Sequence, residues 1–143
     1  LQPQLRQRGI EPLVRCHPPL APPELALLLQ TLDVFVIPSH QEGLCIAALE
    51  AMACATPVVS TRCGGPEQYV LEERTGQLVG SDPQSMANAI AAIATDRPRR
   101  ESLAQGALRW ISDHASTASA RSTFHRQLKA TWPHLPIHLA EAL

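Results

Sequence analysis

The chain has 143 residues and a formal net charge of −1, from 12 Lys and Arg against 13 Asp and Glu. Its length fits a single domain. Aromatic residues make up only 3%, and the basic residues form no stripe, so the composition excludes a nucleic-acid-binding protein, which needs clustered Lys and Arg or a row of stacking rings.

The first 32 residues predict two helices and a short strand between them. Leu1–Arg8 has Leu and Arg at helical spacing, and Pro12–Cys16 contains an apolar pair that is typical of a strand. Pro22–Leu32 predicts a helix, because proline suits the first turn and Glu24 suits the positive end of the helix.

The middle of the chain predicts a buried parallel sheet. Asp33–Ile37 is an unbroken β-branched and aromatic run, which is typical of a strand buried on both faces. A loop, Ser39–Gly43, and a helix, Leu44–Cys54, follow it. Val58–Ser60 is the next predicted strand.

The rest of the chain repeats the alternation of strand and helix. Gly64-Gly65-Pro66 predicts a turn into a short helical stretch near Glu67–Leu71. The following strand and helices are predicted at Gln77–Val79, Pro83–Ala94, Arg97–His114 and Ala115–Trp132. This order predicts an α/β fold, a parallel sheet flanked by helices, with residues 1–132 as one domain and residues 133–143 as a tail.

Helix Leu44–Cys54 carries one charged residue, Glu50, among ten apolar ones. A helix that is apolar all round is buried, and a buried carboxylate needs a partner, yet no basic residue lies one turn away. Two interpretations stay open. Glu50 faces a ligand or a distant partner, or it is a surface residue on a half-exposed helix.

The loop before this helix predicts a binding site for an anion. It follows the carboxyl end of a parallel strand, where open α/β sheets bind ligands, and a helix N-terminus there attracts a diphosphate. Gly43 permits close backbone approach. Glu42 and Glu50 would hold hydroxyls on either side, a pattern that matches a nucleotide sugar.

Several ordered blocks, sharpest between Asp33 and Val79, resemble the C-terminal domain of the group 1 glycosyltransferases, which are retaining enzymes of the GT-B fold. The family's mark is two glutamates with seven residues between them, here Glu42 and Glu50. The other matching blocks are Pro38-Ser39, Leu49–Ala53, Thr56–Val59, Gly64–Glu67 and Thr75–Val79.

The resemblance implies roles for individual residues. Glu42, the implied catalytic residue, would contact the donor sugar near its reacting carbon, and Glu50 would bind the ribose hydroxyls. Four consecutive residues would bind the sugar and the diphosphate: Gly43, Leu44, Cys45 and Ile46. Relatives commonly have glycine at the positions of Cys45 and Ala55. Gly64-Gly65 would shape a loop near the donor phosphates or, as we favour, simply turn the chain.

The resemblance also implies an activity. A sugar would pass from a nucleoside-diphosphate sugar to a hydroxyl acceptor (a glycan, a lipid-linked sugar or a small molecule) with retention, and without a cofactor or metal, since the sequence has no Asp-x-Asp pair. Residues 1–132 would form a single partial Rossmann-like domain that binds the donor. The chain would need a further N-terminal Rossmann-like domain, so we expect it to be inactive alone. The alternatives are a non-catalytic fragment or binding module, and a phosphorylase or epimerase of the same fold.

The sequence predicts a cytoplasmic protein. The alternative location is the cytosolic face of a membrane, in the full-length enzyme. No secretory signal opens the chain, and the longest apolar run, Leu44–Leu49, is too short to span a bilayer. The four cysteines form no Cys-x-x-Cys pair, so a zinc framework is not predicted.

Overall fold

The computed structural model describes residues 2–132 and confirms the α/β prediction. Its sheet has three parallel strands in the order β1-β2-β3, with Phe35 opposite Val58 and Val59 opposite Gln77. The strands are β1 (Phe35–Ile37), β2 (Val58–Thr61) and β3 (Gly76–Val79). The predicted tail, residues 133–143, lies outside the described residues.

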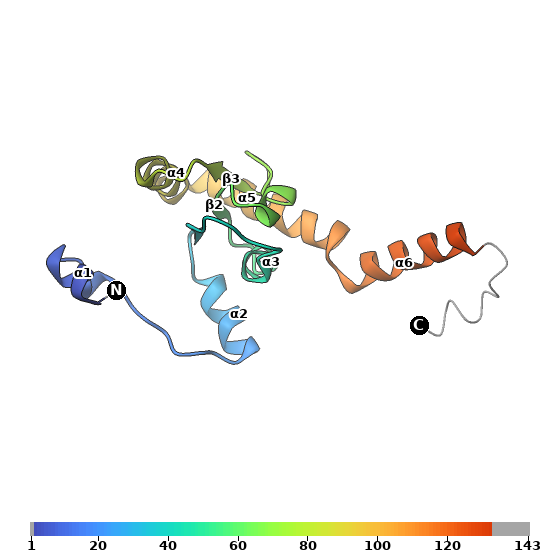
Figure 1. Ribbon diagram of the computed structural model, residues 1–143, viewed down its shortest axis with the longest axis horizontal. Coiled ribbons are helices and arrows are strands. Elements are labelled where there is room, and N and C mark those ends of the chain that lie inside the picture. Colours follow the sequence, from blue (N-terminus) through green and yellow to red (C-terminus); the bar gives the residue numbers. More distant parts are fainter. Residues whose placement is uncertain (1, 133–143) are drawn as a thin grey trace.

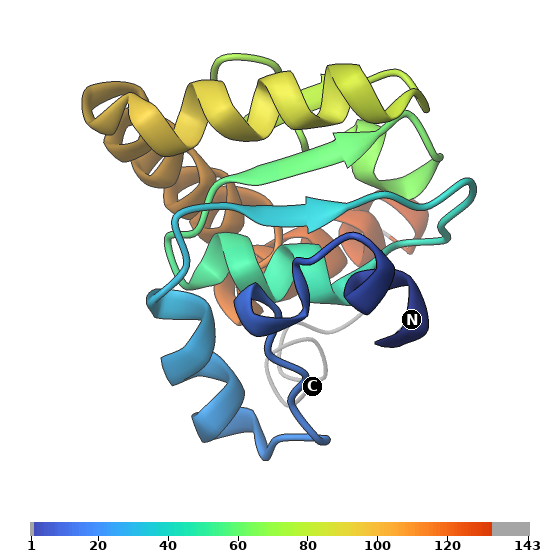
Figure 2. The same cartoon turned by 90° about the vertical axis from the view of Figure 1, so that its left-hand side faces the viewer.

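Helices cover both faces of the sheet (Figure 1 and Figure 2). In Figure 2, α4 lies above the strands and α3 below them, while α5 packs against α3, α4 and β3. Helix α6 extends away from the sheet in Figure 1 and contains no buried residue. The helices are α1 (Gln2–Gln7), α2 (Pro22–Gln30), α3 (Ile46–Ala53), α4 (Pro83–Thr95), α5 (Arg97–His114) and α6 (Thr117–Thr131), with two short 3-10 helices, η1 (Glu11–Leu13) and η2 (Gly65–Gln68).

Two apolar clusters hold these layers together, one on each face of the sheet. The cluster beneath α3 and α5 includes Met52, Val58 and Tyr69, and the cluster beneath α4 includes Val59 and Ile93. Neighbouring side chains of a strand point to opposite faces, so β2 contributes to both clusters. All four residues of β2 are buried.

The predicted strand at Pro12–Cys16 is wrong. Its first residues form the 3-10 helix η1, in which the amide of Val14 donates to the carbonyl of Glu11 at 3.1 Å. Leu13 is 82% exposed. A strand needs a neighbouring strand to bond its backbone, and within residues 2–132 no strand pairs with this segment.

The first predicted strand of the sheet, Asp33–Ile37, is shorter and less buried than expected. It begins at Phe35, and only Ile37 is fully buried. β1 has a single neighbour in the described sheet, so its outer side lacks the cover that a central strand receives.

None of the helices within residues 2–132 combines the length and apolar character that a bilayer crossing requires.

Candidate functional site

The loop Ser39–Cys45, here called the α3 loop, leaves the carboxyl end of β1 and leads into α3. It continues the pairing of the sheet beyond the strands, because the amide of Glu42 donates to the carbonyl of Cys63 at 2.7 Å. In return, the amide of Gly65 donates to the carbonyl of Glu42 at 3.2 Å. The loop is therefore held at the edge where open α/β sheets bind ligands.

Two glycines of the neighbouring segment fit directly against the α3 loop. A Cβ atom on Gly65 would lie 1.6 Å from the carbonyl oxygen of Gly43, and one on Gly64 would lie 2.8 Å from that of Glu42. Gly64 also has a φ of 105°, which strains any other residue. The sequence favoured a simple turn at these glycines, but in the structure both glycines also shape the α3 loop.

The start of α3 differs from the predicted Leu44 because Cys45 is left-handed, with φ 54° and ψ 70°. The helix begins at Ile46, two residues later than predicted, and the amide of Ala48 donates to the carbonyl of Cys45 at 3.0 Å. Within the described part of the chain, the amides of residues 43–47 donate no hydrogen bond. Free amides at a helix N-terminus attract anions.

Tyr69 supports the loop from inside the domain. Its hydroxyl lies 2.7 Å from the carbonyl oxygen of Leu44 and 3.1 Å from that of Cys45, and its single proton is shared between both in a bifurcated hydrogen bond. The residue is 1% exposed, and burial raises the pKa of its hydroxyl, which therefore keeps its proton. Partial burial likewise raises the pKa of the Cys45 thiol. Sequence reasoning missed Tyr69, although it is the only tyrosine of the chain.

The two glutamates occupy different surroundings. Glu42 is half-buried, and its carboxylate accepts a 2.6 Å hydrogen bond from Ser39. Glu50 is exposed, as is Ile46 one turn earlier on the same face of α3. The interpretation of α3 as a helix buried all round is therefore wrong, because one face packs on the core and the other is open.

Glu50 lies at a pocket of about 230 Å³ between α2 and α3. Glu42 is not among its lining residues, so the expectation that both carboxylates flank one concave site stays a prediction. The pocket is mostly apolar and is lined by Leu20, Pro22, Leu25, Ala26, Leu29, Glu50, Ala53 and Cys54.

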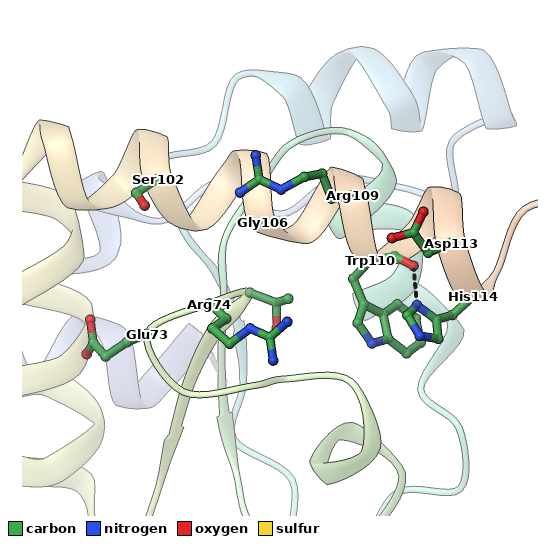
Figure 3. A pocket seen from close by; sticks show the side chains of 9 residues that line it. Glu73, Arg74, Ser102, Gly106, Arg109, Trp110, Asp113 and His114 are labelled. Atoms are coloured by element: carbon green, nitrogen blue, oxygen red, sulfur yellow. Dashed lines mark hydrogen bonds between the residues drawn. The ribbon is translucent and has the colours of Figure 1, made fainter.

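A second cavity, of about 340 Å³, lies between α5 and the residues before β3 (Figure 3). Gly106 lets the two segments touch, since a Cβ atom there would lie 1.7 Å from the carbonyl oxygen of Arg74. Trp110 lines this cavity, and its ring centroid lies 5.7 Å from that of Tyr69 and 4.7 Å from that of His114. Trp110 thus lines this cavity and also contacts Tyr69, the residue that supports the α3 loop.

No group of three or more His, Cys, Asp and Glu side chains that could hold a metal ion occurs within residues 2–132. Whether the chain acts without a metal or cofactor stays a prediction.

Comparison with protein families gives one match over most of the chain. The family described as "Glycosyl transferases group 1" matches residues 1–96. A D-inositol 3-phosphate glycosyltransferase of Thermomonospora curvata is 38% identical over 130 residues, which cover 90% of this chain and 29% of that protein. One of Stackebrandtia nassauensis is 42% identical over 109 residues, covering 76% and 24%. The chain spans less than a third of these relatives.

Solved structures share the same fold. Sucrose-phosphate synthase from Thermosynechococcus elongatus superimposes with a TM-score of 0.81 at 28% identity, covering 91% of this chain and 34% of that one. Anabaena HepE, solved in complex with UDP and glucose, superimposes with a TM-score of 0.80 at 23% identity, covering 90% and 35%. At the latter identity the likeness concerns the fold alone.

Proposed function

This chain belongs to the group 1 glycosyl transferases, and from that premise we propose that it is the donor-binding part of a retaining glycosyltransferase. Its parallel sheet between helices is the GT-B type of architecture. The proposed enzyme transfers a sugar from a nucleoside-diphosphate sugar to a hydroxyl acceptor.

The observation that carries this proposal is the set of free amides at the start of α3. They lie in a loop that Gly64 and Gly65 support through close backbone contact. The diphosphate of the donor binds at these amides, from Gly43 to Ile46. When the bond between the sugar and the diphosphate breaks, the electron pair stays on the phosphate oxygen, and preorganised amides stabilise that charge without a metal.

The two glutamates then bind the two ends of the donor. Glu42, beside the amides and fixed by Ser39, contacts the sugar near its reacting carbon. Glu50 binds the ribose hydroxyls at the mouth of the apolar pocket between α2 and α3, which receives the nucleoside. The open face of α3 supports this role, because an exposed carboxylate is accessible to a ligand.

Calorimetric titration with the diphosphates of uridine, guanosine and adenosine tests the proposal. We expect one of them to bind, and Glu50→Ala to weaken it about fivefold, the value of one hydrogen bond of about 1 kcal/mol. Glu72→Ala is the matched control, since Glu72 is also exposed and lies before β3. Unchanged affinity in Glu50→Ala would remove the ribose role.

We further propose that the 143-residue chain transfers no sugar by itself. It spans about 29% of the Thermomonospora relative, and a GT-B reaction takes place in a cleft between two Rossmann-like domains. A radiolabelled-donor assay with the purified chain should give no product above background. Turnover would contradict this, whereas donor binding without turnover in a chain joined to an N-terminal Rossmann-like domain would favour a non-catalytic binding module.

A further inference from the structure

Tyr69 stands outside the loop that is proposed to bind the donor, yet its hydroxyl hydrogen-bonds to the backbone of that loop. Its hydroxyl lies 2.7 Å and 3.1 Å from the carbonyl oxygens of Leu44 and Cys45. Both carbonyls point inward, because the tyrosine is 1% exposed and belongs to the apolar core with Met52.

The direction of these carbonyls determines the direction of two amides. A trans peptide unit is planar, and its C=O and N–H bonds point in opposite directions. The carbonyl of Leu44 shares its unit with the amide of Cys45, and the carbonyl of Cys45 shares its unit with the amide of Ile46. Holding both carbonyls inward therefore turns two successive amides outward, and successive outward amides form an anion-binding concavity.

The conformation that presents these amides is not the intrinsic preference of the chain. Cys45 adopts φ 54°, and a left-handed residue with a Cβ atom is disfavoured. Something outside the loop must stabilise it. The two hydrogen bonds from Tyr69 do so, together with the bond from the amide of Ala48 to the same Cys45 carbonyl.

Tyr69 is itself held on two sides. The hydroxyl of Thr75 donates to its carbonyl at 2.6 Å, and the ring of Trp110 packs against its ring at 5.7 Å. The phenol therefore cannot swing away without disturbing the core beneath α5.

We propose that Tyr69 is a positioning residue for the diphosphate: it holds the left-handed bend at Cys45 so that the amides of Cys45 and Ile46 face the phosphate groups. This inference rests on the proposed function for its ligand, but the bend itself can be tested without one.

The test variant is Tyr69→Phe in the full chain, which keeps the ring and its contact with Trp110 and removes only the hydroxyl. The matched control is Thr56→Val, which also removes one buried hydroxyl that donates to a carbonyl, that of Leu29 at 2.7 Å. Tyr69→Phe should speed hydrogen exchange at the Ala48 amide roughly fivefold to tenfold, the equivalent of one lost hydrogen bond. The control should leave that amide unchanged relative to the rest of α3.

Ligand binding supplies a readout that a purely structural role would not change. Tyr69→Phe should weaken a nucleoside diphosphate roughly fivefold and leave the affinity for the corresponding free nucleoside unchanged. Equal exchange at Ala48 in the two variants, or an equal loss of diphosphate and nucleoside affinity, would overturn the inference. If the wild-type chain binds no diphosphate, the proposed function fails, and the exchange experiment still decides whether Tyr69 holds the bend.

Discussion

The two ends of α3 each stabilise a left-handed residue, but by different kinds of hydrogen bond. Each end contains a left-handed residue that is not glycine, Cys45 with φ 54° before the helix and Ala55 with φ 62° after it. At the C-terminal end, the backbone bonds that hold the left-handed residue are local. The amides of Ala55 and Thr56 donate to carbonyls of the last helical turn, at 3.1 Å and 2.9 Å, in a Schellman motif.

At the N-terminal end, one bond is local, from the amide of Ala48 to the carbonyl of Cys45, but the other partners, Gly65 and Tyr69, come from more than 20 residues away. A local cap closes a helix whatever the rest of the domain does, whereas a bend held from a distance depends on the packing of the whole domain. The difference teaches that the geometry of the candidate site is a tertiary property, and that it is the more vulnerable of the two ends.

The largest effect should follow from Gly65→Ala, which attacks the distant support. Its Cβ atom would lie 1.6 Å from the carbonyl oxygen of Gly43, so the backbone of η2 or of the α3 loop must move. We expect a destabilisation of roughly 1–3 kcal/mol in urea unfolding. Gly43→Ala is the control, since a Cβ atom there meets nothing within 4 Å. Equal stability of the two variants would contradict the close fit.

Replacing either left-handed residue by glycine should stabilise the chain by a smaller amount. Relief of the left-handed strain exceeds the added freedom of glycine in the unfolded chain, so Cys45→Gly and Ala55→Gly should each gain about 0.5–1 kcal/mol. Urea unfolding measures both. Only Cys45→Gly should also change nucleoside-diphosphate affinity, and a change of affinity in Ala55→Gly would break the distinction between the two ends.

The smallest effect concerns the two cysteines that mark these ends, Cys45 and Cys54. Burial raises the pKa of the Cys45 thiol, so less thiolate is present at neutral pH and alkylation should gain speed only as the pH rises towards that pKa. Mass spectrometry after iodoacetamide treatment should show a few-fold slower labelling of Cys45 than of the exposed Cys16. A saturating nucleoside diphosphate should slow the labelling of Cys45 further, slow that of Cys54, which lines the proposed nucleoside pocket, and leave that of Cys16 unaffected.

Sequence patterns predicted the elements that local bonds define. The helix starting at Pro83 begins there because Asp82 accepts a 2.8 Å hydrogen bond from the amide of Ser85, and Asp96 caps Arg97–His114 in the same way. Such caps use residues that are adjacent in the sequence, so the pattern is visible without a structure.

The features that escaped prediction depend on distant contacts. The apolar pair in Pro12–Cys16 looks like a strand, but a strand forms only beside another. The exposed face of α3 stayed one of two interpretations, because Glu50 is the only charge in a nearly uniform apolar sequence and a single charge does not fix which face meets the core. The link from Tyr69 to Leu44 and Cys45 spans 24 or 25 residues and has no local signature.

The position of β2 between the two apolar clusters has a consequence for how this domain unfolds. Its neighbouring residues Val58 and Val59, both fully buried, belong to the two apolar clusters on opposite faces of the sheet. If either cluster unfolds, it exposes one face of β2, and the other cluster packs against the opposite face of the same strand. Melting should therefore be cooperative across both layers, with calorimetric and van't Hoff enthalpies in agreement for the sheet and its flanking helices. Helix α6, which buries no residue, stands outside that cooperative unit.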